Sequence, residues 1–130
     1  MDYETTEHAV HLLVYHFVWC PKYRRPVLTG DIESRLRQIL FEVAIEHGWA
    51  VIQLAVQPDH LHIFLRCKPT DTPHRVVRAC KGRTSRLLRQ EFSSLRSRIP
   101  TLWTRSYFCS TAGNVSAATI ERYIATQKSV

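Results

Sequence analysis

One eight-residue stretch, residues 58–65 with the sequence PDHLHIFL, constrains the fold of this chain more than any other. Successive side chains of a β-strand point to opposite faces, so His60 and His62 share one face while Leu61 and Ile63 share the other. The apolar face needs a hydrophobic core beneath it. The other face presents two imidazoles about 7 Å apart along the strand, a separation that lets both side chains bind one metal ion.

The His-x-His pattern has a second interpretation, which the pattern taken alone favours. Two histidines at alternate positions of a sheet are more often structural or surface residues with ordinary hydrogen bonds than metal ligands. The rest of the chain therefore has to decide between a metal site and a pair of structural histidines.

The length and composition are those of one globular domain, residues 1–130. Hydrophobic residues make up 45% of the chain and charged residues 22%, which argues against a disordered protein. No apolar run is long enough to span a membrane and the first residues, MDYETTE, do not form a signal peptide, so we expect a cytoplasmic protein with no membrane partner. The four cysteines are widely spaced, so we expect reduced, mostly buried thiols rather than disulfides or a zinc knuckle.

The net charge favours an anionic partner such as nucleic acid. Eighteen Lys and Arg against eleven Asp and Glu give +7 at pH 7, and most basic residues fall in residues 66–105. A short basic loop at residues 21–26 adds to them; it is equally well interpreted as a solvated turn. The candidate DNA-binding residues are Lys22, Arg24 and Arg25 in this loop and Arg78, Lys81, Arg83 and Arg86 in the second predicted helix.

The order of the predicted elements indicates an α+β fold. The patterns predict a strand at 11–20, a helix capped by Asp31 and ended by Gly48, strands at 49–56 and from His60, a helix opened by Thr72 and Pro73, a loop at 94–104, a strand at 105–111 and a helix capped by Ser116. The first six of these elements match the ferredoxin-like plan, a four-stranded antiparallel sheet with two helices on one face.

In this plan the second face of the sheet carries the histidines, because Leu61 and Ile63 are needed under the helices. Tyr15, Phe17 and Trp19 of the first strand could stack on nucleic-acid bases if they are left uncovered, although each is more often a core residue. Gly82 in the second helix indicates close approach of another backbone.

The final helix contains a second candidate pair, Tyr123 and Gln127. Residues four apart lie on one helical face. If that face lies on the histidine strand, Gln127 supplies an oxygen ligand and the Tyr123 hydroxyl can attack a metal-bound phosphodiester. The alternative is a partly exposed amphipathic helix, and the spacing alone favours this alternative.

Six short motifs, in one order, together resemble one family. They are WCPKYR at 19–24, QPDHLH at 57–62, Lys81-Gly82 before Ser85-Arg86, Tyr107-Phe108, GNVS at 113–116, and Tyr123-Ile124 before Gln127. Over about residues 8–127 the chain resembles the single-tyrosine HUH transposases of the smallest bacterial and archaeal insertion sequences. It departs from the usual pattern at Leu61, where valine is more common, and at Gln57, where methionine is.

The resemblance implies a mechanism. His60, His62 and Gln127 would bind Mg²⁺ or Mn²⁺, and Tyr123 would form a 5′-phosphotyrosine link to single-stranded DNA with hairpin ends. Members of the family act as homodimers with active sites shared between subunits. The resemblance divides the chain into a ferredoxin-like core at 8–112 and a hinge with the tyrosine helix at 113–130, in which Gly113-Asn114 forms the joint.

Two other functions remain open. Ferredoxin-like sheets also occur in non-catalytic modules that bind single-stranded nucleic acid, and such a module does not need Tyr123 together with the two histidines. A domesticated relative that processes chromosomal repeats would use the same chemistry on another substrate, so the sequence does not separate it from the enzyme of a mobile element.

Overall fold

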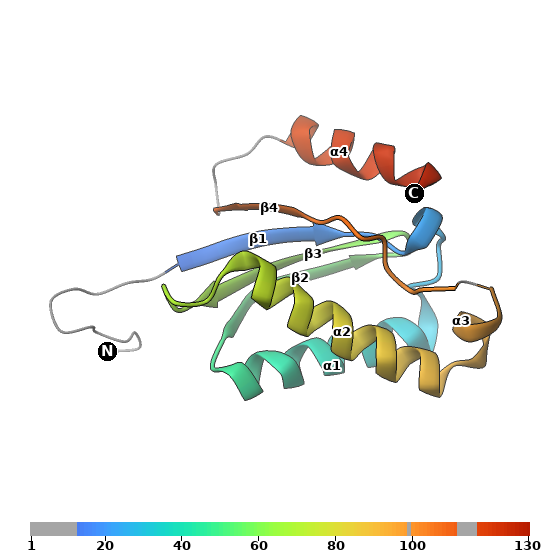
Figure 1. The fold of residues 1–130 in the computed structure, drawn as a ribbon, viewed down its shortest axis with the longest axis horizontal. Coiled ribbons are helices and arrows are strands. Elements are labelled where there is room, and N and C mark those ends of the chain that lie inside the picture. Colours follow the sequence, from blue (N-terminus) through green and yellow to red (C-terminus); the bar gives the residue numbers. More distant parts are fainter. Residues whose placement is uncertain (1–12, 99, 112–116) are drawn as a thin grey trace, which may run out of the picture.

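A four-stranded antiparallel sheet forms the centre of the computed structural model (Figure 1). The structure describes residues 13–98, 100–111 and 117–130. The strands β1 (Leu13–Trp19), β2 (Ala50–Gln57), β3 (His60–Cys67) and β4 (Phe108–Thr111) lie in the order β2-β3-β1-β4. This is the strand order of the predicted ferredoxin-like plan, and the α+β fold is confirmed.

Two long helices, α1 (Gly30–His47) and α2 (Pro73–Glu91), cover one face of the sheet (Figure 1). Leu61, Ile63 and Leu65 of β3 point under them and are 0–1% exposed, as the alternation predicts. Phe17 and Trp19 of β1 belong to the same core, each 0% exposed. Phe17 and Trp19 are therefore core residues that cannot stack on bases, and Tyr15 is partly buried against the same core.

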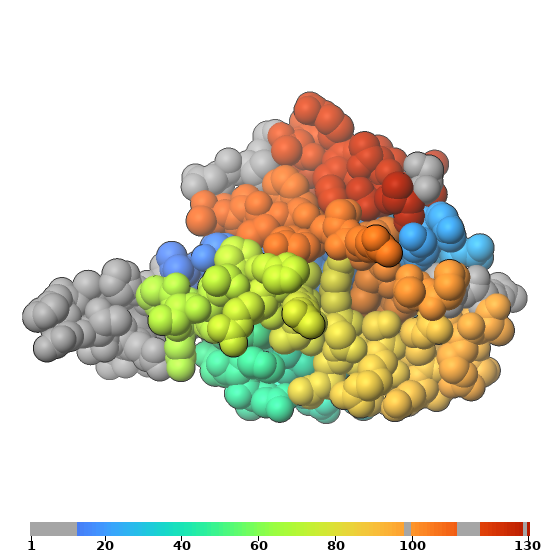
Figure 2. All heavy atoms as spheres, viewed as in Figure 1, coloured from blue at the N-terminus to red at the C-terminus, as the bar shows by residue number. Residues whose placement is uncertain are grey.

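The opposite face of the sheet is covered by helix α4 (Ala117–Thr126), which is followed by a short 3₁₀ turn, η2 (Gln127–Ser129). In Figure 2 the atoms of α4 lie close against the segment that contains β4, on the side of the molecule away from α1 and α2. The fold thus has three layers. The predicted histidine face is the one between the sheet and α4.

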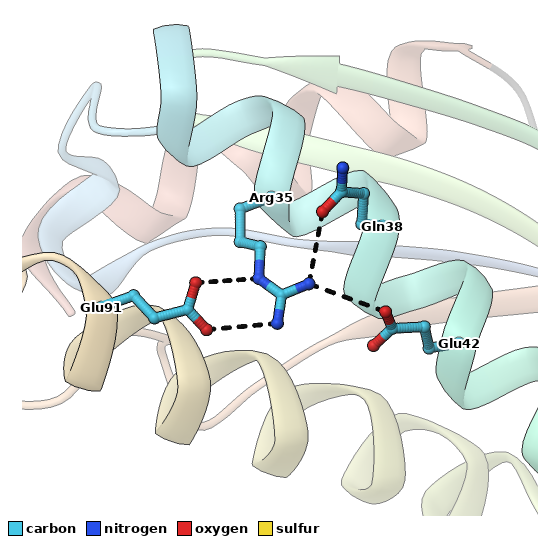
Figure 3. Close-up of polar contacts among 4 residues, drawn as sticks. All are labelled: Arg35, Gln38, Glu42 and Glu91. Carbon is cyan, nitrogen blue, oxygen red and sulfur yellow. Dashed lines mark hydrogen bonds and ion pairs between the residues drawn. The ribbon is translucent and has the colours of Figure 1, made fainter.

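The helix layer is joined on its outer surface by one ion-pair cluster (Figure 3). Arg35 of α1 donates from Nε and Nη2 to the two carboxylate oxygens of Glu91 in α2, at 2.8 and 3.2 Å. Its Nη1 also reaches Gln38 Oε1 at 3.3 Å and Glu42 Oε1 at 3.7 Å. The hydrogen bond to Glu91 raises the pKa of Arg35. The pairs are exposed to solvent, so they link the two helices but contribute little to the stability of the fold.

The helix starts illustrate one confirmed and one wrong prediction. Helix α2 begins as predicted: Thr72 is the N-cap and its hydroxyl accepts a hydrogen bond from the Arg75 N–H, with Pro73 in the first turn. Helix α1 does not begin at Asp31. Its N-cap is Thr29, and Asp31 lies inside the first turn, where a carboxylate still interacts favourably with the helix dipole.

Three further predictions are corrected between α2 and β4. A short helix, α3 (Ser93–Arg98), forms where a loop was predicted. The last strand begins at Phe108 rather than 105, because the Thr104 and Ser106 carbonyls accept hydrogen bonds from the Lys81 ammonium instead of pairing in the sheet. The prediction that another backbone lies close to Gly82 is wrong, because a Cβ placed there would meet no atom within 4 Å.

Other boundaries differ by one or two residues. Strand β2 begins one residue later than predicted and contains an irregularity between Val51 and Gln53.

The cysteines are free, with Cys20, Cys67 and Cys80 buried and Cys109 half-buried. The predicted joint at Gly113-Asn114 and the Ser116 cap lie outside the described residues, as does the start of the first strand. Among the helices described, none is both long and apolar enough to cross a bilayer.

Candidate active site

The two histidines of β3 lie on the sheet face that α4 covers, beside an open cavity of about 670 Å³. His60 and His62 line this cavity together with Asp59. On the helix side it is lined by Ile120, Glu121 and Ile124 of α4. The structure therefore brings the sheet-borne imidazoles and α4 to one site.

A carboxylate orients the first imidazole. His60 Nδ1 donates to Asp59 Oδ1 at 2.7 Å, and Asp59 Oδ2 is itself held by Arg24 Nε at 2.9 Å. The positive φ of Arg24, +53°, belongs to the turn that places its guanidinium here. This chain of contacts fixes the ring of His60 and leaves Nε2 as the nitrogen available to a ligand.

A third histidine contacts the second imidazole. His62 Nδ1 lies 3.0 Å from His16 Nε2, in β1. Burial, followed by electrostatic interaction with His60 and His16, lowers the pKa of His62 to about 4. His62 is therefore neutral at pH 7, the form in which imidazole binds metal ions.

The donor set fits a divalent cation in part. His60 Nδ1 donates to the Asp59 carboxylate, which leaves Nε2 of that ring for a metal ion, and Nε2 of His62 is free in the same way when His62 donates from Nδ1 to His16. Within the described residues no group of three or more His, Cys, Asp or Glu could hold a metal ion. Any further protein ligand must then come from another residue type, as the amide of Gln127 would, or from outside this group.

Tyr123 and Gln127 lie on one face of the C-terminal segment, as their spacing predicts, but they contact Ser106 rather than the imidazoles. Ser106 Oγ donates to Gln127 Oε1 at 2.9 Å and lies 3.0 Å from the Tyr123 hydroxyl. A serine hydroxyl has one hydrogen, so the phenol must be the donor to Ser106. The Gln127 amide closes the network by donating to the Tyr123 carbonyl at 3.3 Å.

The environment of Tyr123 keeps its hydroxyl protonated. Burial raises the pKa of the phenol, and the hydrogen bond with Ser106 opposes this effect only in part. Gln127 is 5% exposed. Across the described residues, no hydrogen bond or ring contact joins Tyr123 or Gln127 to either histidine of β3. The two halves of the predicted site are therefore not in direct hydrogen-bond or ring contact within the described part of the chain.

The predicted DNA-binding residues fall into two groups. Three of them have partners within the chain: Arg24 pairs with Asp59, Arg83 with Glu46, and Lys81 donates to two backbone carbonyls at 2.7 and 2.8 Å. Burial lowers the pKa of Lys81 to about 8. The others, for which the structure gives no ion pair in its described part, are Lys22, Arg25, Arg78 and Arg86.

Three residues near the site were not predicted from the sequence as functional residues. Asp59 could have been found, because it precedes His60 directly and a carboxylate beside a ligand histidine is a common orienting partner. His16 and Ser106 give no such signal, since each is more than 15 residues from its partner. Arg105 also lines three cavities, two with Lys22 and one with Arg78.

Comparison with known proteins gives one consistent family. The family model described as "Transposase IS200 like" matches residues 9–127. The ISDra2 transposase TnpA of Deinococcus radiodurans is 35% identical over 120 residues, which cover 91% of this chain and 86% of that protein. The transposase for insertion sequence element IS200 of Salmonella typhimurium is 27% identical over 125 residues, or 95% of this chain and 82% of that one.

Solved structures share the fold. A crystal structure of a Deinococcus radiodurans R1 protein assigned as a transposase superposes with a TM-score of 0.89 at 30% identity, covering 98% of this chain and 99% of that chain. A REP-associated tyrosine transposase bound to a REP hairpin gives a TM-score of 0.58 at 13% identity, over 98% of this chain and 67% of that one. At this lower identity the likeness concerns the fold alone.

Proposed function

Because this chain belongs to the IS200-like transposase family, we propose that it cuts and rejoins single-stranded DNA at insertion-sequence ends through a covalent link to Tyr123. One observation carries the proposal: Tyr123 and Gln127 are paired on the segment that covers the sheet face bearing the two histidines. A non-catalytic nucleic-acid module has no need of this combination.

The proposed reaction is a transesterification at phosphorus. The Tyr123 oxygen forms a bond to the phosphorus of a phosphodiester, and its proton is released. The bond from phosphorus to the 3′ oxygen breaks, and that oxygen takes up a proton to become a free 3′ hydroxyl. The product is a 5′-phosphotyrosine, whose bond energy allows a 3′ hydroxyl to reverse the step without an external energy source.

His60 and His62 are the residues that would hold a divalent cation, Mg²⁺ or Mn²⁺, through their Nε2 atoms. Such a cation would polarise the phosphate and neutralise developing negative charge. The neutral state of His62 at pH 7 supports this role. Gln127 would add its amide oxygen after its hydrogen bond with Ser106 is released.

We further propose that the complete site forms between two copies of the chain. The support is the set of partners within one chain: Tyr123 and Gln127 are hydrogen-bonded to Ser106 instead of to the histidines, while Ile120, Glu121 and Ile124 face the histidine cavity. A second copy could supply the missing half to each site. This shared arrangement also makes cleavage depend on dimer formation.

The proposed substrate is a single strand with hairpin ends. The net charge of +7 favours it, and so do the basic residues Lys22, Arg25, Arg78 and Arg86, which have no ion pair in the described part of the chain. A structural neighbour of the same fold was solved with a REP hairpin, which supports the choice of a hairpin as the first substrate to test.

The test is adduct formation on a hairpin-bearing strand taken from the flanks of the gene. With Mg²⁺ or Mn²⁺ the wild-type chain should form a covalent protein–DNA adduct that survives denaturing electrophoresis. Tyr123→Phe should form none, yet should still bind the strand. An adduct that persists in Tyr123→Phe would disprove the nucleophile.

A matched control is Tyr15→Phe. Tyr15 is also a partly buried tyrosine, but its ring packs against Phe17 in the core. This variant should keep the adduct at the wild-type level. Strand binding without any adduct in the wild type would instead favour a binding module.

A further inference from the structure

His16 is a buried polar residue at the proposed metal site, to which the sequence analysis gave no role. It lies in β1, paired in register with Phe64 of β3, while the next residue but one, Val18, is paired with His62. His16 and His62 are thus diagonal neighbours on one sheet face. Their ring nitrogens, His16 Nε2 and His62 Nδ1, are 3.0 Å apart.

The ring of His16 is held firmly in place. It is 6% exposed and stacks on Phe64 with a centroid distance of 4.2 Å and an interplanar angle of 6°. The Phe108 ring meets it edge-on at 6.4 Å. His16 therefore presents its Nε2 to His62 from a fixed position.

One hydrogen can lie between the two nitrogens, and its location decides whether His62 can bind a metal ion. If His16 donates, the single proton of neutral His62 sits on Nε2, and the ring has no free lone pair to offer. If His62 donates from Nδ1, its Nε2 lone pair is free for a metal ion. The hydrogen bond is compatible with either direction, but only the second is compatible with a metal site.

The other histidine of the pair, His60, donates from Nδ1 in the same way, but to a different acceptor. His60 Nδ1 donates to the Asp59 carboxylate, which cannot donate in return. We infer that His16 is the corresponding positioning residue for His62: it accepts the Nδ1 proton, so that both rings offer Nε2 to one cation. This inference rests on the proposed metal site and adds the residue that sets the form of its second ligand.

The first test reads the proton directly, without metal. In ¹⁵N-detected histidine spectra of the metal-free full chain at pH 7, His62 should appear as the Nδ1–H form and His16 should accept at Nε2. In His16→Phe the acceptor is lost, and the Nδ1–H form of His62 should no longer dominate. A wild-type His62 that carries its proton on Nε2 would overturn the inference.

The second test measures Mn²⁺ binding by the electron paramagnetic resonance signal of the free ion. His16→Phe keeps a ring to stack on Phe64 but removes the acceptor, so the Kd for Mn²⁺ should rise about 10- to 100-fold. His16→Gln restores an acceptor oxygen at a similar reach and should recover most of the affinity. A purely packing role predicts the opposite order for these two variants.

The matched control is His47→Phe. His47 also stacks on an aromatic ring, Trp49, at 4.4 Å and hydrogen-bonds through Nδ1 to the Val43 carbonyl at 2.9 Å, but it lies at the end of α1. Its substitution should leave the Kd for Mn²⁺ unchanged. Wild-type affinity in His16→Phe would refute the positioning role.

The outcomes separate this inference from the proposed function. A wild-type chain that binds no Mn²⁺ would disprove the metal site and, with it, the role of His16. A wild-type chain that binds Mn²⁺ with His62 in the Nε2–H form, or with no dependence on His16, would disprove the inference alone. If His16→Phe does not fold, the wild-type spectrum and His16→Gln still decide.

Discussion

The two faces of the central sheet are built on different principles, although the same strands form both. On the face under α1 and α2, Leu61 and Ile63 are 0% exposed and are held by apolar burial alone. On the face under α4, His60 and His62 alternate with them in the same strand and are held by hydrogen bonds with Asp59 and His16. The first face contributes buried apolar side chains to the core, and the second carries the hydrogen-bonded imidazoles of the candidate site.

The difference shows how a small domain can carry a polar site. A polar group at an interface needs a partner for each atom that loses water. The histidine face meets this need with residues from β1 and from the turn before β3, and none of these partners comes from the helix layer. Changes to the two faces should therefore have separable effects.

The largest effect is expected on the core face. Ile63→Ala removes a fully buried side chain between the sheet and the helices, so the free energy of unfolding should fall by about 2–5 kcal/mol. Urea denaturation followed by circular dichroism measures this loss. The control is Ile52→Ala in the neighbouring strand, 52% exposed, which should cost less than about 0.5 kcal/mol. Equal losses in the two variants would contradict the assignment of the core face.

A smaller effect, specific to acid, is expected on the histidine face. The pKa of His62 is lowered to about 4 by burial, then by the charges of His60 and His16, whereas an unfolded histidine titrates near 6.5. The folded state thus binds fewer protons between these values, and its stability is lost as the pH falls from about 6.5 towards 4. Allowing for partial solvent screening, the loss should be on the order of 1–2 kcal/mol.

Urea denaturation at several pH values tests this prediction. His62→Gln cannot titrate and should show a shallower fall in unfolding free energy over the same interval. Ile63→Ala serves as the comparison, because it lowers stability equally at every pH. A His62→Gln profile that parallels the wild type would show that this histidine is not the acid-sensitive group.

The smallest effect is expected on the outer surface of the helix layer. Arg35→Gln removes the paired contacts to Glu91 seen in Figure 3, but these groups are exposed to solvent. The thermal unfolding midpoint should fall slightly at low salt and match the wild type at high salt. Arg75→Gln in α2, whose side chain forms no ion pair with the residues described, is the control. A large loss that persists at high salt would mean that the helices depend on this cluster rather than on apolar burial.

Much of the fold could be predicted from local patterns. The alternation of β3 predicts which of its residues are buried, and Thr72-Pro73 predicts the start of α2, because both signals act within a few residues. The helix α3 and the late start of β4 could not be predicted in this way. The start of β4 follows from a contact between residues 23 apart, Lys81 and the Thr104 carbonyl, and α3 packs Leu95 into the core.

The sequence by itself determined which side chains this protein has for chemistry: two imidazoles on one face of a strand, and a phenol and an amide one helical turn apart. Only the tertiary structure decided their partners. Strand register places His16 beside His62, and the packing of α4 places Tyr123 at Ser106 instead of at the histidines. The physical reason is that periodicity fixes the direction of a side chain within its own element, whereas a neighbour from another element depends on how the whole chain packs.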